Sequence, residues 1–345
     1  MEILVTGGTG LLGRHLVDAL LERGDSVRVL AFPTEDTSSL EHRGAVIHRG
    51  DIRNPETLVP AMRGCEGLFH VAALVAEWRS MADYRAINVT GTANVCRAAL
   101  AEGVRRVVHV SSTSVYGLAL GYPASESLPL APFSDPYPVT KAEGEELVRR
   151  MIVEDDLPAA IVRPDLIFGP GDQRNFRRFA DRLRSGRGII IGSGDNALPL
   201  VYVTDVVQGL LLAFDHDVAL GQVYNITNDR RLTQREFMEA IARAVGAPPP
   251  RYRIPYAALY AVGYAAERVA RLTGSKLRPP TTRFGVAFLG TESLATIDKA
   301  RRELGYSPQV NLHDGVRLAA GWYLQATRSA AVEPAVASVG DEVGG

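Results

Sequence analysis

The sequence predicts an α/β fold in which a doubly wound parallel sheet is followed by a smaller C-terminal lobe. The first observation is an alternation of short β-branched runs with longer helical patterns over the first half of the chain. The second is a glycine-rich turn that directly follows the first of these runs and leads into a helical pattern. A chain of 345 residues, 46% of them apolar, is long enough for a large buried core and a second lobe.

Six short runs are expected to form the strands of the sheet. They are Ile3 to Thr6, Ser26 to Leu30, Ala45 to His48, Gly67 to Val71, Arg106 to Ser111 and Ala159 to Arg163. Helices that join parallel strands cover both faces of their sheet. We therefore assign residues 1–170 to this domain, with some later segments returning to it.

The pattern becomes irregular beyond the last of these runs. Turn clusters stand at Gly169-Pro170-Gly171 and at Gly192-Ser193-Gly194-Asp195, and a proline-rich break follows at Pro248 to Pro250. Residues 171–326 are expected to form the smaller, substrate-binding lobe. Residues 327–345 lack periodicity and are poor in large apolar side chains, so we expect a disordered tail.

Composition and charge argue against several classes of protein. The formal net charge of -1 indicates no field that would attract nucleic acid or an anionic membrane. The two cysteines, Cys65 and Cys96, are too few for a disulfide framework and lack metal-ligand spacing, so we expect core residues and no metal site. The chain opens on a strand-like run, and its longest nearly uncharged apolar stretch, Ile254 to Ala266, is shorter than a membrane span. A cytoplasmic protein without a transmembrane segment or a nucleic-acid partner is expected.

The glycine-rich turn runs from Thr6 to Gly13 and precedes a helical pattern over Arg14 to Arg23. Glycine allows a tight turn, a close approach of the backbone to a pyrophosphate, and tight packing of helix against strand. The helix N-terminus favours an anion. Glycines also collect in turns for steric reasons alone, but the flanking strand and helix favour a Rossmann-type dinucleotide site. The residues of this turn expected to bind the dinucleotide are Gly7, Thr9, Gly10, Leu11, Leu12 and Gly13.

The residue that would distinguish NAD from NADP is missing from its usual place. An acid for the NAD ribose, or an arginine for the NADP phosphate, is expected about 20 positions after the turn. Ala31 and Phe32 stand there instead. Four charged residues lie near enough in sequence to substitute, namely Arg14, Glu35, Asp36 and Arg43. Asp51 either accepts a hydrogen bond from the adenine amino group or caps the turn before Pro55. We prefer NAD to NADP.

Tyr137 and Lys141 lie four residues apart, which places both side chains on one face of a predicted helix. A tyrosine of pKa about 10 needs a shift of roughly three units to act as a base near neutrality. A nearby ammonium favours the phenolate, so we expect Lys141 to lower the pKa of Tyr137 and to hydrogen-bond the nicotinamide ribose. A surface cation over an aromatic ring is the other interpretation, which the scarcity of lysine in this chain disfavours.

Small hydroxyl side chains follow the fifth predicted strand, in the run Ser111-Ser112-Thr113-Ser114. Open α/β sheets bind ligands at the carboxyl ends of their strands, so one of these hydroxyls is expected to face the reacting oxygen. Hydroxyl clusters after strands also serve turns, and that alternative stays open.

Together these motifs resemble the extended short-chain dehydrogenase/reductase superfamily, in its NAD-dependent epimerase/dehydratase group. The resemblance extends to about Tyr323. The motifs that carry it are Thr6 to Gly13, Asp51-Ile52, Val71-Ala72-Ala73, Ser111 to Gly117 and Tyr137-Pro-Val-Thr-Lys141.

The resemblance implies roles for particular residues. It makes Ser112, Tyr137 and Lys141 the catalytic residues, with Thr113 the next candidate for the hydroxyl. It places Asn88 on a helix beneath the site, and the segment from Arg163 to Gly169 on the nicotinamide side. The further residues expected at the cofactor are Asp51, Ile52, Ala72, Ala73 and Pro164, together with Tyr137 and Lys141.

Two branches of the superfamily compete, one acting on nucleotide sugars and one resembling 3β-hydroxysteroid dehydrogenases. The Tyr-Pro-Val-Thr-Lys form and the segment Ile297 to Tyr306 are similar to the second branch. Leu198-Pro199-Leu200 replaces the Arg-Asp-Phe-like run common in sugar-nucleotide enzymes. Five arginines could still bind phosphates, although a solvated helix face is the more common role of such a pattern. They are Arg174, Arg177, Arg178, Arg182 and Arg184.

The expected function is therefore an NAD(P)-dependent oxidoreductase that interconverts a secondary alcohol and a ketone on a mostly apolar, steroid- or lipid-like small molecule. The alternatives are a nucleotide-sugar 4-epimerase or dehydratase with tightly bound NAD, and a non-catalytic dinucleotide sensor. The helix over Tyr256 to Leu272 is interpreted as a lid, a shallow membrane contact or plain core. The resemblance further implies a homodimer, formed through residues 83–101 and 137–150.

Overall fold

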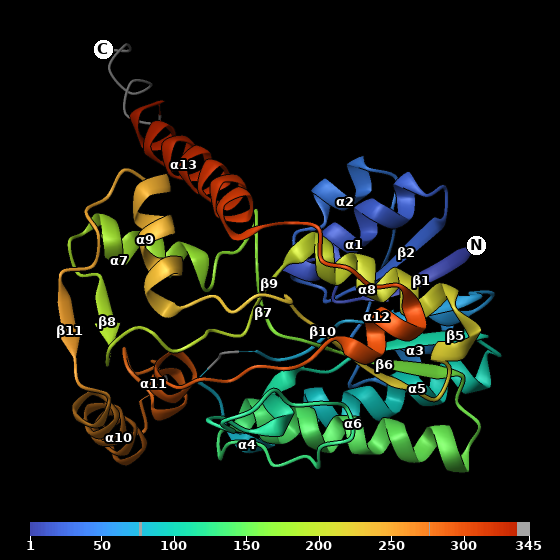
Figure 1. Cartoon of the computed structure of the whole chain (residues 1–345). Coiled ribbons are helices and arrows are strands. Elements are labelled where there is room, and N and C mark those ends of the chain that lie inside the picture. Colours follow the sequence, from blue (N-terminus) through green and yellow to red (C-terminus); the bar gives the residue numbers. More distant parts are fainter. Residues whose placement is uncertain (76–77, 276, 337–345) are drawn as a thin grey trace, which may run out of the picture.

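The computed structural model describes residues 1–75, 78–275 and 277–336. Its centre is a parallel sheet of seven strands in the order β10-β6-β5-β4-β1-β2-β3 (Figure 1). The strands are β1 (Glu2–Thr6), β2 (Ser26–Ala31), β3 (Val46–Arg49), β4 (Gly67–His70), β5 (Arg106–Val110), β6 (Ala159–Pro164) and β10 (Val223–Ile226). All six predicted runs lie in this sheet, so the predicted fold class is confirmed. The seventh strand comes from beyond residue 170.

Helices cover both faces of the sheet, as the alternation of patterns predicts. On one face α1 (Leu11–Glu22) and α8 (Val203–Asp215) pack against Ile3 and Val5 of β1. On the other face Leu4 packs with residues of α3 (Pro55–Met62), α5 (Thr92–Ala101) and α6 (Pro136–Glu154). The shorter elements are α2 (Ser38–His42), α4 (Met81–Arg85), the π-helix η1 (Ala86–Gly91), the 3-10 turns η2 (Thr113–Tyr116) and η3 (Asp217–Ala219), and α12 (Asp298–Leu304). Cys65 and Cys96 are buried in the second layer, as expected of core residues.

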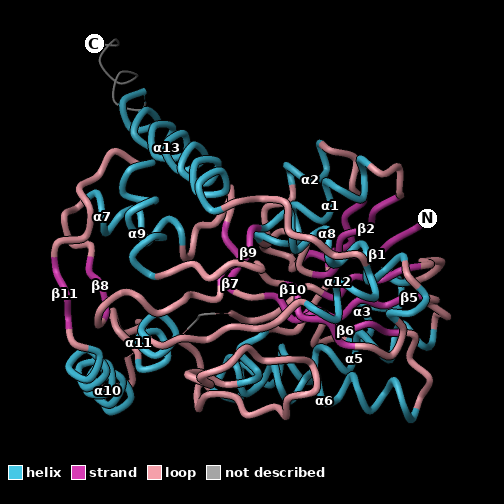
Figure 2. The backbone as a smooth tube through the Cα atoms, in the orientation of Figure 1, coloured by secondary structure: helices cyan, strands magenta, loops and turns pink. Residues whose placement is uncertain are grey.

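A smaller group of elements lies beyond the carboxyl ends of the strands, on the left of Figure 1. Its helices are α7 (Phe176–Arg184), α9 (Gln234–Ala244), α10 (Tyr256–Leu272), α11 (Arg283–Gly290) and α13 (Leu312–Val336). Two short parallel pairs complete it, β8 (Ile189–Ile191) with β11 (Tyr252–Ile254) and β7 (Leu166–Phe168) with β9 (Leu200–Tyr202). Figure 2 shows the long loops that pass between this lobe and the sheet.

The C-terminal segment corrects one expectation. Helix α13 continues to Val336, so the first part of the tail expected to be disordered is helical, and residues 337–345 lie outside the described residues. The helix is anchored by buried residues earlier in its length, such as Val316 and Tyr323. Alanine-rich sequence readily continues a helix that has already been nucleated, and this outweighs its lack of large apolar side chains.

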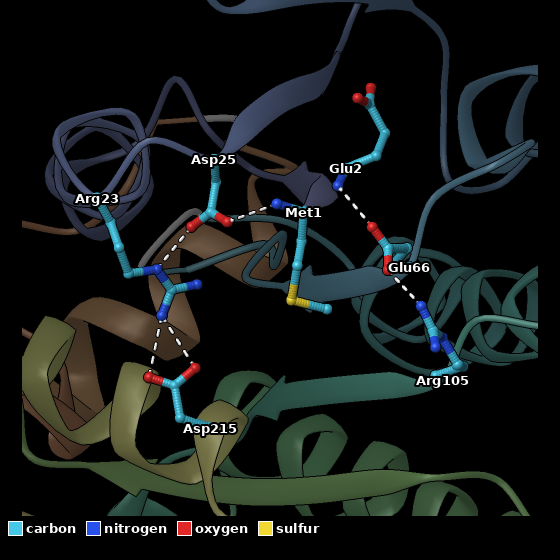
Figure 3. A network of polar contacts seen from close by, with 7 residues as sticks. All are labelled: Met1, Glu2, Arg23, Asp25, Glu66, Arg105 and Asp215. Atoms are coloured by element: carbon cyan, nitrogen blue, oxygen red, sulfur yellow. Dashed lines mark hydrogen bonds and ion pairs between the residues drawn. The ribbon is translucent and has the colours of Figure 1, made fainter.

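Exposed ion pairs hold the edge at which the strands begin, which we call the amino edge (Figure 3). The N-terminal ammonium of Met1 lies 3.0 Å from Asp25, which also receives Arg23. Arg23 reaches on to Asp215 at the end of α8, at 2.9 Å. These contacts tie β1 and β2 to the helix that covers one face.

Candidate active site

A cavity of about 970 Å³ lies at the opposite edge, between the carboxyl ends of the strands and the lobe. We call this edge the carboxyl edge. Every residue that was predicted to be catalytic or to bind the cofactor lines this cavity. They are Gly7, Thr9, Gly10, Leu11, Leu12, Gly13, Asp51, Ile52, Ala72, Ala73, Ser112, Tyr137, Lys141 and Pro164. The fold therefore brings together segments that are far apart in the sequence.

The glycine-rich turn forms a cradle that side chains would fill. Gly7 has a φ of +73°, and a Cβ added to it would lie 2.7 Å from the backbone nitrogen of Ala72. Gly10 is the N-cap of α1, and in the described chain neither a capping side chain nor an acidic residue occupies the first turn of that helix. The first N–H groups of α1 thus keep their capacity to bind an anion. This arrangement fits the pyrophosphate of a dinucleotide.

Asp51 takes neither a free position nor the N-cap position. It accepts hydrogen bonds from the backbone and the guanidinium of Arg53, at 2.9 and 2.8 Å, and these bonds lower its pKa. Asn54 is the N-cap of α3 and accepts from the backbone of Glu56. Asp51 instead caps the turn before Pro55, as one interpretation of the sequence proposed, and the backbone N–H of Asn54 closes that turn by donating to the carbonyl of Asp51 at 2.8 Å.

The end of β2 presents an aromatic ring and a carboxylate to the cavity. Phe32 and Glu35 both line it, and a carboxylate oxygen of Glu35 accepts the backbone N–H of Phe32 at 2.9 Å. The Arg53 guanidinium lies 6.0 Å from the centre of the Phe32 ring. Glu35, four residues past the end of the strand, thus places a carboxylate at the cavity.

Tyr137 and Ser112 meet inside the cavity. Tyr137 lies in the first turn of α6, where the Asp135 carboxylate accepts its backbone N–H at 3.2 Å. Burial raises the pKa of the Tyr137 phenol, while a hydrogen bond with Ser112 and the charge of Arg174 oppose that rise. Burial has the largest effect on this pKa, and Lys141 is not among the groups that shift it. At neutral pH Tyr137 therefore holds a proton that it can donate.

Lys141 lies one turn further along α6 and is buried. Its ammonium donates to the carbonyl of Val110 at the end of β5, at 2.7 Å. Burial lowers the pKa of Lys141 to about 8, although the nearby charge of Glu145 raises it. The cation is thus held at the junction of the helix and the central strand, facing the cavity.

A buried ion pair that the sequence analysis missed lies beneath these residues. Arg163 and Glu145 are both fully buried, with Arg163 Nε 2.9 Å from the carboxylate of Glu145. Ser111 donates to the same carboxylate at 2.7 Å, and Tyr116 receives the other end of the guanidinium. The spacing of Lys141 and Glu145, four residues on one helix, was the signal that could have identified it. Arg163 supports the site from below, while the residues after it, from Pro164 to Ile167, line the cavity.

Asp165 is a second missed residue, and it lines the cavity directly after Pro164. Thr113 donates to one of its carboxylate oxygens at 2.6 Å, and Thr227 donates to the other. Burial raises the pKa of Asp165 to about 6, against the effect of both threonines. Because Thr113 is engaged here, Ser112 is the hydroxyl that remains beside Tyr137.

Asn88 lies on the π-helix η1 and is buried beneath the site, where the resemblance places it. Its amide nitrogen donates to Thr140 of α6 at 3.0 Å and to the carbonyl of Leu74 at 3.1 Å. Its amide oxygen accepts the backbone N–H of Leu74 at 2.8 Å. Asn88 thereby fixes the loop after β4 against the helix that carries Tyr137.

The lobe side of the cavity is mostly apolar. It is formed by side chains from β8, α9, α10 and α11, together with Trp78 and Leu198. The apolar residues on these elements are Ile189, Ile191, Phe237, Met238, Leu259, Phe284, Val286, Phe288 and Leu289. Such a wall suits an apolar ligand.

Three of the five arginines considered as phosphate ligands, Arg174, Arg178 and Arg182, line the cavity. Arg174 donates to the carbonyl of Val75, and Arg182 donates to that of Pro280 at 3.2 Å. The other two arginines do not line the cavity. Arg177 lies 3.9 Å from Asp181, and Arg184 lies over the ring of Tyr323.

The described residues contain no cluster of three potential metal-ligating side chains. None of the helices described is both long enough and apolar enough to cross a membrane.

The chain is similar to a protein family, to characterised relatives and to solved structures. The family model described as "NAD dependent epimerase/dehydratase family" matches residues 3–227. A 2-alkyl-3-oxoalkanoate reductase of Stenotrophomonas maltophilia is 36% identical over 92% of this chain and 98% of its own length. The 3beta-hydroxysteroid-dehydrogenase/decarboxylase isoform 1 of Arabidopsis thaliana is 33% identical over 91% of this chain and 77% of its own. The crystal structure of gox2253 is similar with a TM-score of 0.81 and 32% identity, covering 95% of this chain and 99% of that one.

Proposed function

The chain belongs to the NAD dependent epimerase/dehydratase family, and we propose that it interconverts a secondary alcohol and a ketone on a mostly apolar, steroid- or lipid-like molecule. It is an NAD(P)-dependent enzyme of the extended short-chain dehydrogenase/reductase type. The observation that carries the proposal is the shape of one cavity, which joins the glycine-rich cradle and Tyr137 to the apolar wall of the lobe.

The proposed roles of the residues follow from their positions. A nicotinamide dinucleotide, when bound, accepts or supplies the hydride. The cradle from Gly7 to Gly13 would hold its pyrophosphate, and Lys141 would hold its nicotinamide ribose. Ser112 orients the oxygen of the substrate by a hydrogen bond, and Tyr137 donates a proton to that oxygen in the direction of ketone reduction.

The substrate class is inferred from the wall and from the relatives. The names of the two relatives specify an oxoalkanoate and a hydroxysteroid, both of which combine an oxygen function with a large apolar body. The lobe of this chain offers aromatic and aliphatic side chains, including Phe237, Phe284 and Phe288, to such a body. In place of the diphosphate-binding run, the buried Leu198 lines the same cavity.

We further propose NAD as the preferred dinucleotide. Glu35 offers a carboxylate to hydroxyl groups of an adenosine ribose at the end of β2, and that carboxylate would repel a phosphate in the same place. The charge of Arg53 is already engaged by Asp51. We expect kcat/KM to be higher with NADH than with NADPH. Glu35→Gln should bring the two kcat/KM values closer together. A preference for NADPH in the wild-type enzyme would contradict this assignment.

A cytoplasmic homodimer is the proposed form of the enzyme. The expected interface consists of residues 83–101 and 137–150, which here form the helices from α4 to α5 and most of α6. Light scattering of the purified chain measures its mass in solution, and a monomer at all concentrations would exclude the dimer.

The direct test of the function is an assay of the purified protein. The protein is first analysed for retained dinucleotide and then incubated with NADH or NADPH and a panel of 2-alkyl-3-oxoalkanoates, 3-oxosteroids and UDP-sugars. We expect net oxidation of the reduced dinucleotide with an apolar ketone and none with the sugars. Tightly retained dinucleotide, together with sugar interconversion and no net redox change, would assign the chain to the epimerases instead.

A further inference from the structure

Helix α10 exposes an apolar face to solvent. The residues of this outer face are Ala258, Ala261, Val262, Ala265, Val269 and Leu272, all of them exposed. Val262 is 56% exposed, Val269 59% and Leu272 86%. Their spacing of three and four residues places them on one side of the helix. The outer face thus presents an uninterrupted apolar strip along the helix.

The opposite face of α10 accounts for the packing of the lobe. Leu259, Gly263, Glu267 and Ala270 are the buried residues of this helix. A Cβ added to Gly263 would lie 3.0 Å from the backbone of Thr282, so the two segments are in close contact. Tyr256, Leu259 and Tyr260 pack in the core of the lobe, and of these three only Leu259 lines the cavity, whereas Tyr264 is 47% exposed. The outer face is not needed for this packing.

A surface helix in water normally buries its apolar side and exposes its charged side. In α10 the acidic residue, Glu267, is buried and binds the backbone and side chain of Arg283 at 2.7 and 2.9 Å. The solvent-facing strip contains only alanine, valine and leucine. Leu277, 81% exposed just after the helix, adds to this apolar surface. Contiguous exposed apolar surface of this kind marks an interaction site.

Cations outnumber acids in the sequence around α10. Between residues 247 and 291 the sequence has seven cations and one acid, the buried Glu267. The cations are Arg251, Arg253, Arg268, Arg271, Lys276, Arg278 and Arg283. The net charge of -1 for the whole chain conceals this local excess of positive charge. An apolar strip bordered by arginine is the pattern of a helix that lies flat in the interface of an anionic membrane.

We infer that the outer face of α10 docks on the surface of an anionic lipid bilayer. This inference differs from the expectation, drawn from net charge alone, that no anionic membrane is attracted. Figure 1 shows α10 at a corner of the molecule with α11 on its inner side, so a flat surface can reach it. A second copy of the chain is a poorer occupant, because a twofold contact through this face would bring identical clusters of cations together.

Docking in this orientation brings the wall of the cavity to the lipid surface. Trp78, which lines the cavity, donates from its indole nitrogen to the carbonyl of Ser275 just after α10, at 3.0 Å. The segment from Arg278 to Thr282 also lines the cavity and joins α10 to α11.

Sedimentation of the full chain with lipid vesicles tests the inference. Vesicles of phosphatidylcholine mixed with phosphatidylglycerol are compared with vesicles of phosphatidylcholine alone, without cofactor or substrate. We expect binding to the anionic vesicles, weaker binding at high salt, and little binding to the neutral ones. The double variant Val262→Glu, Val269→Glu should bind the anionic vesicles about tenfold more weakly, since charge enters the apolar strip.

The matched control is Val153→Glu, a residue of α6 that is 81% exposed and far from α10 in sequence. Its vesicle binding should equal that of the wild type, and circular dichroism should show all the variants folded. Wild-type protein left in the supernatant, or equal binding by the double variant, would overturn the inference. A dimer that the double variant dissociates, without vesicle binding, would overturn it in favour of a second copy. Because no turnover is measured, the result is independent of the proposed function.

Discussion

The two edges of the central sheet contain similar ion-pairing residues in different surroundings. At the amino edge, Arg105 and Glu66 form an ion pair in which both side chains are more than one third exposed (Figure 3). At the carboxyl edge, Arg163 and Glu145 form an ion pair that is fully buried. An exposed pair contributes little to stability, whereas breaking a buried pair leaves an uncompensated charge in the interior.

Burial also shifts the pKa values of residues at the two edges to different extents. At the carboxyl edge it lowers the pKa of Lys141 to about 8 and raises that of Asp165 to about 6. At the amino edge, the pKa of Asp25 is lowered: partial burial raises it, but the N-terminal ammonium and Arg23 outweigh that effect. The lobe covers only the carboxyl edge, so that edge is where charges are desolvated and where proton-transfer chemistry is possible.

The largest expected effect is on turnover. Tyr137→Phe removes the proposed proton donor, and we expect kcat to fall by about a thousandfold, within the range found for general acid catalysis. Steady-state assays with the best apolar ketone measure this change. Tyr122→Phe, at a tyrosine that is 57% exposed outside the cavity, is the control and should keep the wild-type rate. An unchanged kcat in the Tyr137 variant would refute its role.

The next effect is on stability. Glu145→Gln keeps the size of the side chain but leaves the Arg163 guanidinium buried without its counter-charge. We expect the free energy of unfolding to fall by about 3 to 5 kcal/mol. The matched change at the amino edge, Glu66→Gln, should cost less than about 1 kcal/mol. Urea unfolding of the three proteins measures both values, and similar losses would show that the edges do not differ in this respect.

The pH dependence of stability should have opposite signs for two carboxyl groups, Asp165 at the carboxyl edge and Asp25 at the amino edge. The folded pKa of Asp165, about 6, lies above the value of about 3.9 for an unfolded chain. Its contribution to stability is therefore complete below about pH 4 and is lost as the pH rises through 6, by about 2 to 3 kcal/mol. The lowered pKa of Asp25 predicts the reverse, a contribution present above about pH 4 and lost as the pH falls.

Unfolding measured at several pH values separates these contributions. The stability of the wild type relative to Asp165→Asn should decline between pH 4 and 7. The stability of the wild type relative to Asp25→Asn should instead decline on acidification. A difference between the wild type and Asp165→Asn that does not vary with pH would contradict the raised pKa.

The smallest effect compares two glycines with positive φ. Gly7→Ala at the carboxyl edge would place a Cβ 2.7 Å from the Ala72 backbone, whereas Gly103→Ala, just before β5, would meet no described atom within 4 Å. We expect losses of about 2 kcal/mol or more for Gly7→Ala and about 1 kcal/mol for Gly103→Ala. Thermal unfolding measures the stabilities, and fluorescence of bound NADH should show weaker binding in the Gly7 variant alone. Equal binding by both variants would argue against the cradle.

The fold and most of the site residues could be predicted because their signals are local. The β-branched runs and the glycine-rich turn are each contained within a few residues, and Tyr137 and Lys141 are one helical turn apart. Glu145 and Asp165 were not predicted as site residues, and Glu35 was only one of four charged residues considered near the end of the second strand. Each acquires its place from a partner or a wall that the fold supplies, as when Thr113 and Thr227 meet at Asp165. Contacts between residues that are far apart in the sequence leave no local pattern from which they could be predicted.

The order of apolar and polar residues along the chain is enough to specify the sheet, its glycine-rich turn and the pairing of Tyr137 with Lys141 on α6, because backbone geometry and helical spacing depend on near neighbours. The directions of the pKa shifts, the buried ion pair and the outward apolar face of α10 required the folded structure. All three depend on which surfaces are removed from water, and burial is set by segments that meet across the whole chain. The case of Tyr137 illustrates the division: its position was predictable, but the direction of its pKa shift was not.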